Sequence, residues 1–126
     1  MKKTFLLITI ILLTMLTACT RKVGWGGSNI GNSFDATYQL FEGEETEKIR
    51  LSNGARFSLN YDITVEEGVL TLQIRDPNKT LIWEESFNEN IQDSLSFPAE
   101  VEGRYTLDII GDETQGGFDL QWEIEE

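Results

Sequence analysis

The sequence of 126 residues contains no histidine and only one cysteine, Cys19. Without histidine, the chain cannot assemble a Ser-His-Asp triad, a Cys-His pair or a histidine-based zinc site. A single cysteine cannot form an intramolecular disulfide, so the fold has to be stabilised by packing. Apolar residues at helical spacing are also nearly absent. These absences exclude most of the familiar catalytic centres and any disulfide framework.

Basic residues are scarce, with 10 Lys and Arg against 22 Asp and Glu and a formal net charge of −12. Such a surface repels phosphate backbones, so we expect no nucleic-acid partner. Carboxylates remain as catalytic groups, since two of them roughly 5–10 Å apart can hydrolyse glycosides. A chain this short has only short turns from which to build a substrate cleft. We therefore expect no enzyme, and a small carboxylate-based hydrolase is the least favoured alternative.

The N-terminal stretch has the order of an export signal. Lys2 and Lys3 precede an uncharged apolar run over residues 4–16, which is shorter than the roughly 20 residues of a membrane-spanning helix. The run ends in Leu16, Thr17, Ala18 and Cys19. These four residues resemble the lipobox of bacterial lipoprotein precursors. The resemblance implies that lipoprotein signal peptidase recognises Leu16, Thr17 and Ala18, and that Cys19 becomes the diacylglyceryl-modified first residue of the mature chain.

Two alternatives to this interpretation are an ordinary secretory signal with an incidental cysteine and an uncleaved membrane anchor. Under the lipoprotein hypothesis, acyl groups on Cys19 hold the protein on the extracytoplasmic face of the cell membrane, or on the outer membrane if the cell has two. Cleavage removes two lysines and no acids, so the net charge of the mature chain becomes −14. No cofactor is expected, and the weak candidate residues for calcium are given below.

The sequence predicts three segments. Residues 1–18 form the lipoprotein signal peptide, residues 19–32 comprise the lipidated cysteine and a tether, and residues 33–126 form one domain. The tether is predicted because residues 20–32 hold four glycines together with Ser and Asn, a composition that is typical of flexible linkers.

Strict alternation of apolar and polar residues dominates the domain and predicts strands that are buried on one face. Short strands with turn signals between them indicate an all-β fold, namely a two-sheet antiparallel β-sandwich that is jelly-roll-like. A small closed barrel is the alternative, and the order of the strands cannot be derived from their spacing. We expect about eight strands, over residues 34–40, 49–51, 57–66, 69–75, 81–87, 95–97, 104–109 and 118–125.

A second resemblance concerns the domain as a whole. The chain is similar to small secreted jelly-roll modules such as prokaryotic pre-peptidase C-terminal domains and the Golgi-dynamics β-sandwich domain. This resemblance implies a β-sandwich with an accessory or binding role and names no ligand. The residues that carry it are Gly68, Leu72-Gln73-Ile74, Asp76-Pro77, Gly103-Arg104-Tyr105, Gly111, Gly117-Phe118 and Trp122.

Clustered acidic residues in two predicted turns are weak candidates for a calcium site, because hard cations take six to eight oxygen ligands. The EF-hand spacing is missing, however, and solvated acidic turns are far commoner than calcium sites. We therefore expect no metal site. The weak candidates are Glu42, Glu44, Glu45, Asp112 and Glu113.

The aromatic residues Trp83, Trp122, Tyr61 and Tyr105 lie on apolar strand faces, which favours core packing over a sugar-binding platform. An exposed sheet edge or a loop remains as the candidate binding surface. The sequence thus favours a non-catalytic, lipid-anchored envelope lipoprotein whose acidic domain binds a protein or an envelope component. The alternative function is a carbohydrate-binding module that acts with or without calcium.

Overall fold

The computed structural model of the protein describes residues 20–126, so Leu16, Thr17, Ala18 and Cys19 lie outside the described part. The described residues form one antiparallel sheet and contain no helix. The prediction of an all-β antiparallel fold is confirmed. The strands are β1 (Arg21–Val23), β2 (Gly26–Ile30), β3 (Ser33–Leu51), β4 (Arg56–Arg75), β5 (Leu81–Phe87), β6 (Ile91–Pro98) and β7 (Gly103–Glu125).

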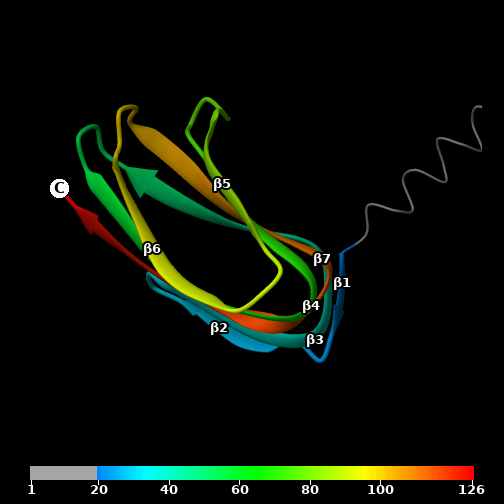
Figure 1. Ribbon diagram of the computed structural model, residues 1–126. Coiled ribbons are helices and arrows are strands. Elements are labelled where there is room, and N and C mark those ends of the chain that lie inside the picture. The colour runs from blue at the N-terminus through cyan, green and yellow to red at the C-terminus, as the bar shows by residue number, and fades with distance from the viewer. Residues whose placement is uncertain (1–19) are drawn as a thin grey trace, which may run out of the picture.

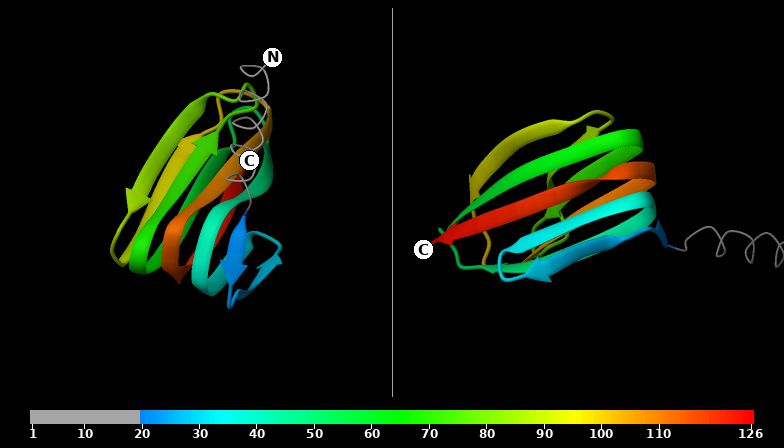
Figure 2. Two further views of the ribbon diagram at one scale, coloured as in Figure 1. Left: turned by 90° about the vertical axis from the view of Figure 1, so that its right-hand side faces the viewer. Right: turned by 90° about the horizontal axis from the view of Figure 1, so that it is seen from below.

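Three long strands, β3, β4 and β7, bend sharply and each run through two layers (Figure 1, Figure 2). The first layer has the order β2, first half of β3, second half of β7, first half of β4, β6. The second layer has the order second half of β3, first half of β7, second half of β4, β5. This is the strand order of a jelly roll. Within the described residues β5 and β6 pair only with β4, so the sheet does not close into a barrel.

The eight predicted strands correspond to β5, β6 and the two halves of each long strand, but three predicted turns are wrong. The sequence predicts turns at residues 42–45, 67–68 and 111–117, where the structure has bends within continuous strands. Register shifts between Tyr38 and Gly43 in β3, and between Val65 and Val69 in β4, mark β-bulges at these bends. A bulge increases local twist and bend while the strands on either side stay paired. Each long strand therefore crosses from one layer to the other while its residues on both sides of the bend stay paired.

The predicted tether also differs from the structure. β1 pairs with residues 40–42 of β3, and β2 pairs with residues 33–37. The missed signal is Gly31-Asn32, which joins β2 to β3 as a two-residue hairpin turn with Gly31 at φ 61° and which is a common sequence for such turns. Only Thr20 separates Cys19 from the first strand. The folded domain therefore begins almost directly after the predicted lipidation site.

The core lies between the two layers and is filled by the inward-facing side chains of β3, β4 and β7. Trp25, between β1 and β2, packs against this core and stacks on Tyr38 with ring centroids 5.5 Å apart. The largest fully buried side chains include Phe41, Phe57, Leu59, Leu72, Leu107 and Leu120.

Candidate functional site

The candidate site lies where the sandwich is open, between the two edge strands β5 and β6 (Figure 1). Trp83 of β5 pairs with the buried Ile74, and Leu95 of β6 pairs with the buried Leu59. Because directly paired residues share a face of the sheet, Trp83 and Leu95 both face the interior. We call the opening between these inner faces the β5–β6 mouth. It consists of residues 83, 85 and 87 of β5 and residues 91, 93, 95 and 97 of β6.

One half of the β5–β6 mouth is a predominantly apolar cleft with a volume of about 390 Å³. It is within the size range of small-ligand pockets. Trp83 and Leu95 are only partly buried, and Ile82 at the rim is 42% exposed. The lining residues are Asp76, Ile82, Trp83, Leu95, Ser96, Phe97, Pro98, Glu100, Val101 and Tyr105.

Most polar groups of the cleft already have partners within the fold. Asp76 Oδ1 accepts hydrogen bonds from the backbone N–H groups of Asn78 and Thr80, both at 2.9 Å, which shapes the turn between β4 and β5. The Tyr105 hydroxyl donates to the Val101 carbonyl oxygen at 2.7 Å. Engaged in this way, these groups stabilise loops and offer little to a ligand, so the cleft presents mainly apolar and aromatic surface.

The other half of the mouth is acidic. Glu85 follows Trp83 on the inner face of β5, and Asp93 precedes Leu95 on the inner face of β6. Tyr61, which is buried, lies between them and donates from its hydroxyl to Glu85 Oε2 at 3.4 Å. Burial, followed by the negative charges of Glu85 and Asp93, raises the pKa of Tyr61 to about 12. The mouth thus joins an apolar cleft to a pair of carboxylates from opposite layers.

The buried tyrosines predict that the protein loses stability in alkali. Burial also raises the pKa of Tyr38 to about 12. Because both tyrosines stay neutral in the fold while unfolded tyrosine ionises near pH 10, their contribution is complete below pH 10 and is lost as pH rises toward 12. Tyr38 contributes on the order of 3 kcal/mol, and Tyr61 contributes less, because solvent at the open mouth screens its hydroxyl. Urea unfolding between pH 8 and 12 should show this loss, and a Tyr38→Phe/Tyr61→Phe variant should show a flatter profile; an equally steep profile would contradict the assignment.

The predicted aromatic core residues are mostly confirmed. Trp122, Tyr61 and Tyr105 are buried, with exposures of 5%, 3% and 3%. Trp83 differs, because β5 is an edge strand and leaves one side of the indole open to the cleft. Sequence alternation correctly places Trp83, Leu95 and Phe97 on inner faces, but it does not reveal that two edge strands leave those faces partly uncovered.

The weak calcium candidates are not gathered into one site. Glu45 forms a salt bridge with Lys22, and Glu42 lies opposite Arg21 in the sheet. Burial, followed by the nearby Asp108, raises the pKa of Glu44. Asp112 and Glu113 lie at the bend of β7, on the strand beside Glu42, between the positions that pair with Phe41 and Gly43. Across residues 20–126 no group of three or more acidic or cysteine side chains is arranged to hold a metal ion.

A second hollow, of about 590 Å³, lies on the outer face of the first layer. Asp35, Asp119 and Asp62 are direct cross-strand neighbours there, and further along β7 Gly116 and Gly117 add no side chains to the hollow. Like charges directly opposite one another destabilise a sheet. The hollow is therefore a solvated, acidic part of the surface.

Comparisons with known proteins agree with the fold. No family model and no curated protein matches the sequence. Among solved structures, the chain is similar to a pre-peptidase C-terminal domain of collagenase from Bacillus anthracis, with a TM-score of 0.55, 13% identity, and coverage of 75% of this chain and 90% of that chain. It is also similar to a structure described as "CBM4 structure and function", with a TM-score of 0.53, 10% identity, and coverage of 86% and 79%.

A third similar structure is the secreted serine protease VesC from Vibrio cholerae, with a TM-score of 0.52 and 13% identity. The match covers 78% of this chain but only 22% of that protease. At these identities the likeness concerns the fold alone. It confirms that the described residues form a β-sandwich. Within residues 20–126, no helix is long and apolar enough to cross a membrane.

Proposed function

We propose that the protein is a non-catalytic binding module, held by lipid on Cys19 at the extracytoplasmic face of the membrane, that binds a protein partner at the β5–β6 mouth. The observation that carries this proposal is the partly uncovered apolar cleft between two edge strands. An edge strand offers unpaired backbone N–H and C=O groups to an extended segment, and adjacent pockets can take its alternate side chains.

The cleft chemistry favours a protein partner over a sugar. Sugar recognition needs several free hydrogen-bonding groups beside an aromatic platform. Asp76 and Tyr105 are engaged within the fold, and Ser96 Oγ accepts a hydrogen bond from Arg56 at 3.0 Å. Apolar side chains of a partner require no such groups and gain about 25 cal/mol for each Å² of apolar surface that they bury.

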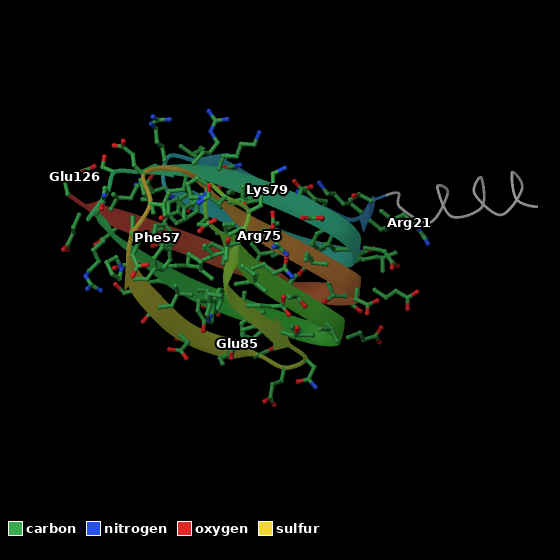
Figure 3. The ribbon with its side chains drawn as sticks, turned by 90° about the horizontal axis from the view of Figure 1, so that it is seen from above. Arg21, Phe57, Arg75, Lys79, Glu85 and Glu126 are labelled. Atoms are coloured by element: carbon green, nitrogen blue, oxygen red, sulfur yellow. The ribbon has the colours of Figure 1, made fainter. Side chains whose placement is uncertain are left out.

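The N-terminal end of the domain and the cleft lie at opposite ends of the sandwich, which supports a role in presenting the cleft away from the membrane. Arg21 lies at the bend of the long strands and Glu126 at the opposite end (Figure 3). Arg21 pairs with Glu42 of β3, at the bend. At the other end of this half of β3, near the cleft, Leu51 pairs with Gly103. At about 3.3 Å per residue, these two positions are roughly 30 Å apart. A lipid on Cys19 would therefore hold the bent end at the membrane and direct the cleft away from it.

Two exposed isoleucines allow a matched test. Ile82 is 42% exposed at the cleft, and Ile30 is 77% exposed on β2, far from it. We expect Ile82→Glu to reduce partner recovery at least about tenfold in pull-downs of the lipidated protein from its own envelope, because the new carboxylate is desolvated on binding. Ile30→Glu should recover the partner normally. Equal recovery by both variants, or no specific partner for the wild type, would contradict the proposal.

A carbohydrate-binding module is the second candidate, since Trp83 presents part of its indole to the cleft and one similar structure is described as a CBM4. A glycan panel with the wild type and a Trp83→Ala variant separates the two functions. Binding of a neutral glycan that is lost in Trp83→Ala would favour this candidate over a protein partner.

A further inference from the structure

The acidic and apolar halves of the β5–β6 mouth have a fixed spacing. Glu85 is two residues beyond Trp83 on β5, and Asp93 is two residues before Leu95 on β6. Residues two apart in a strand share a face and lie about 6.6 Å apart. β5 and β6 run in opposite directions, so Glu85 and Asp93 both lie one inward-facing position nearer to the bend of β4 than Trp83 and Leu95. The two carboxylates therefore face each other across the mouth. The apolar cleft begins at the next inward-facing residue of each strand, Trp83 on β5 and Leu95 on β6.

The two carboxylates lack a cationic partner. The salt bridges within residues 20–126 join Lys22 to Glu45 and Arg75 to Asp108, so neither Glu85 nor Asp93 is paired with a base. Glu85 accepts only the long hydrogen bond from Tyr61, and Asp93 accepts one at 2.8 Å from the backbone N–H of Ser94. A neutral segment that covered these carboxylates would desolvate them without compensation. A basic side chain in the same place would pair with both.

We propose, on the basis of the function proposed above, that the mouth binds an extended segment of a partner protein in which Arg or Lys lies two residues from a large apolar side chain. The base sits between Glu85 and Asp93, and the apolar side chain enters the cleft beside Trp83. The segment's backbone pairs with the free edge of β5 or of β6. The net charge of −14 on the mature chain attracts such a segment at long range.

The same two residues argue against a second copy of this chain as the occupant. Pairing of two copies through these edges would bring inward-pointing acids of like charge together, a feature that protects natural edge strands from self-association. A basic segment experiences the opposite effect. Glu85 and Asp93 would therefore select for a basic partner and against self-association.

Labelled peptides test this proposal on the full lipidated chain in detergent. The probe is fluorescein-labelled Thr-Thr-Arg-Thr-Phe-Thr-Thr, and the comparison peptide carries Gln in place of Arg. We expect the Arg peptide to bind at least about tenfold more tightly by fluorescence anisotropy, which corresponds to about 1.4 kcal/mol. Added salt should reduce this preference.

Two double variants locate the effect. Glu85→Gln/Asp93→Asn should bind both peptides equally, because the paired carboxylates are gone. Glu84→Gln/Asp62→Asn removes the same charge from outward-facing positions and should keep the tenfold preference. Thermal unfolding of both variants confirms that they are folded.

The outcomes separate this proposal from the function on which it rests. Equal binding of both peptides to the wild type, or an unchanged preference in Glu85→Gln/Asp93→Asn, would overturn the basic-segment proposal. The apolar docking site would then still stand if Ile82→Glu loses the partner. If neither peptide binds and Ile82→Glu recovers the partner normally, both proposals fall.

Discussion

Cys19→Ser is expected to abolish incorporation of radiolabelled palmitate and to move the protein out of the membrane fraction, or to leave it unprocessed. Each buried CH₂ of an acyl chain contributes about 0.8 kcal/mol, so two or three chains hold a small domain on a bilayer almost permanently. Serine carries no thiol for thioether formation, and the effect should therefore be complete rather than graded.

Thr20→Ser is a suitable control for this result, because it changes the adjacent residue and leaves the thiol in place. It should label and fractionate like the wild type. The structure adds a second expectation: since only Thr20 lies between Cys19 and β1, an external protease should release little of the domain unless it cuts within a strand. Palmitate labelling of Cys19→Ser at the wild-type level would refute the lipoprotein hypothesis.

Gly68→Val is expected to destabilise the domain by about 2–5 kcal/mol and to lower its melting temperature by roughly 10–20 °C. Gly68 has φ 76°, and a Cβ at this position would lie 2.3 Å from the carbonyl oxygen of Glu113. A non-glycine residue in this conformation costs about 1–2 kcal/mol, and forcing apart the packed strands costs about 1–3 kcal/mol more. Both terms act at the bend where β4 and β7 cross between layers.

Gly26→Ala is the matched control, because Gly26 is also in a strand but has nothing within 4 Å of the position of its Cβ. It should change the melting temperature by no more than a few degrees. Thermal unfolding followed by circular dichroism measures both variants. If Gly68→Val were as stable as Gly26→Ala, the bend at residues 67–68 would not have the described geometry.

The fold could largely be predicted from the sequence because alternation is a local property. The polar residues on either side of Leu72, for example, indicate that its side chain is buried in a strand with one apolar face. Eight segments with this pattern are enough to indicate a sandwich. Local sequence does not determine whether Glu67-Gly68 ends a strand or bends one, because the β-bulge there arises from the pairing of β4 with β7. The sequence also carries turn signals at Asn53-Gly54 and at residues 76–79, and the chain does reverse there. The three turns predicted at the bends are wrong.

The site was less accessible to sequence analysis for a related reason. Alternation gives Trp83 and Phe97 the same pattern as Trp122, which is buried at the centre of the sheet. Only strand order shows that β5 and β6 are edges, and strand order depends on long-range pairing. Glu85 and Asp93 interrupt the apolar inner faces of their strands, and this interruption is the one sequence signal that could have indicated the mouth.

Site-specific photocrosslinking in the native envelope tests most directly whether a partner protein binds at the β5–β6 mouth. A benzoylphenylalanine residue at position 82 lies at the cleft, and one at position 30 lies on the exposed β2. We predict a discrete crosslinked protein from position 82, none from position 30, and loss of the product from position 82 when Glu85→Gln and Asp93→Asn are added. The same product from both positions, or from position 30 alone, would contradict binding at the β5–β6 mouth.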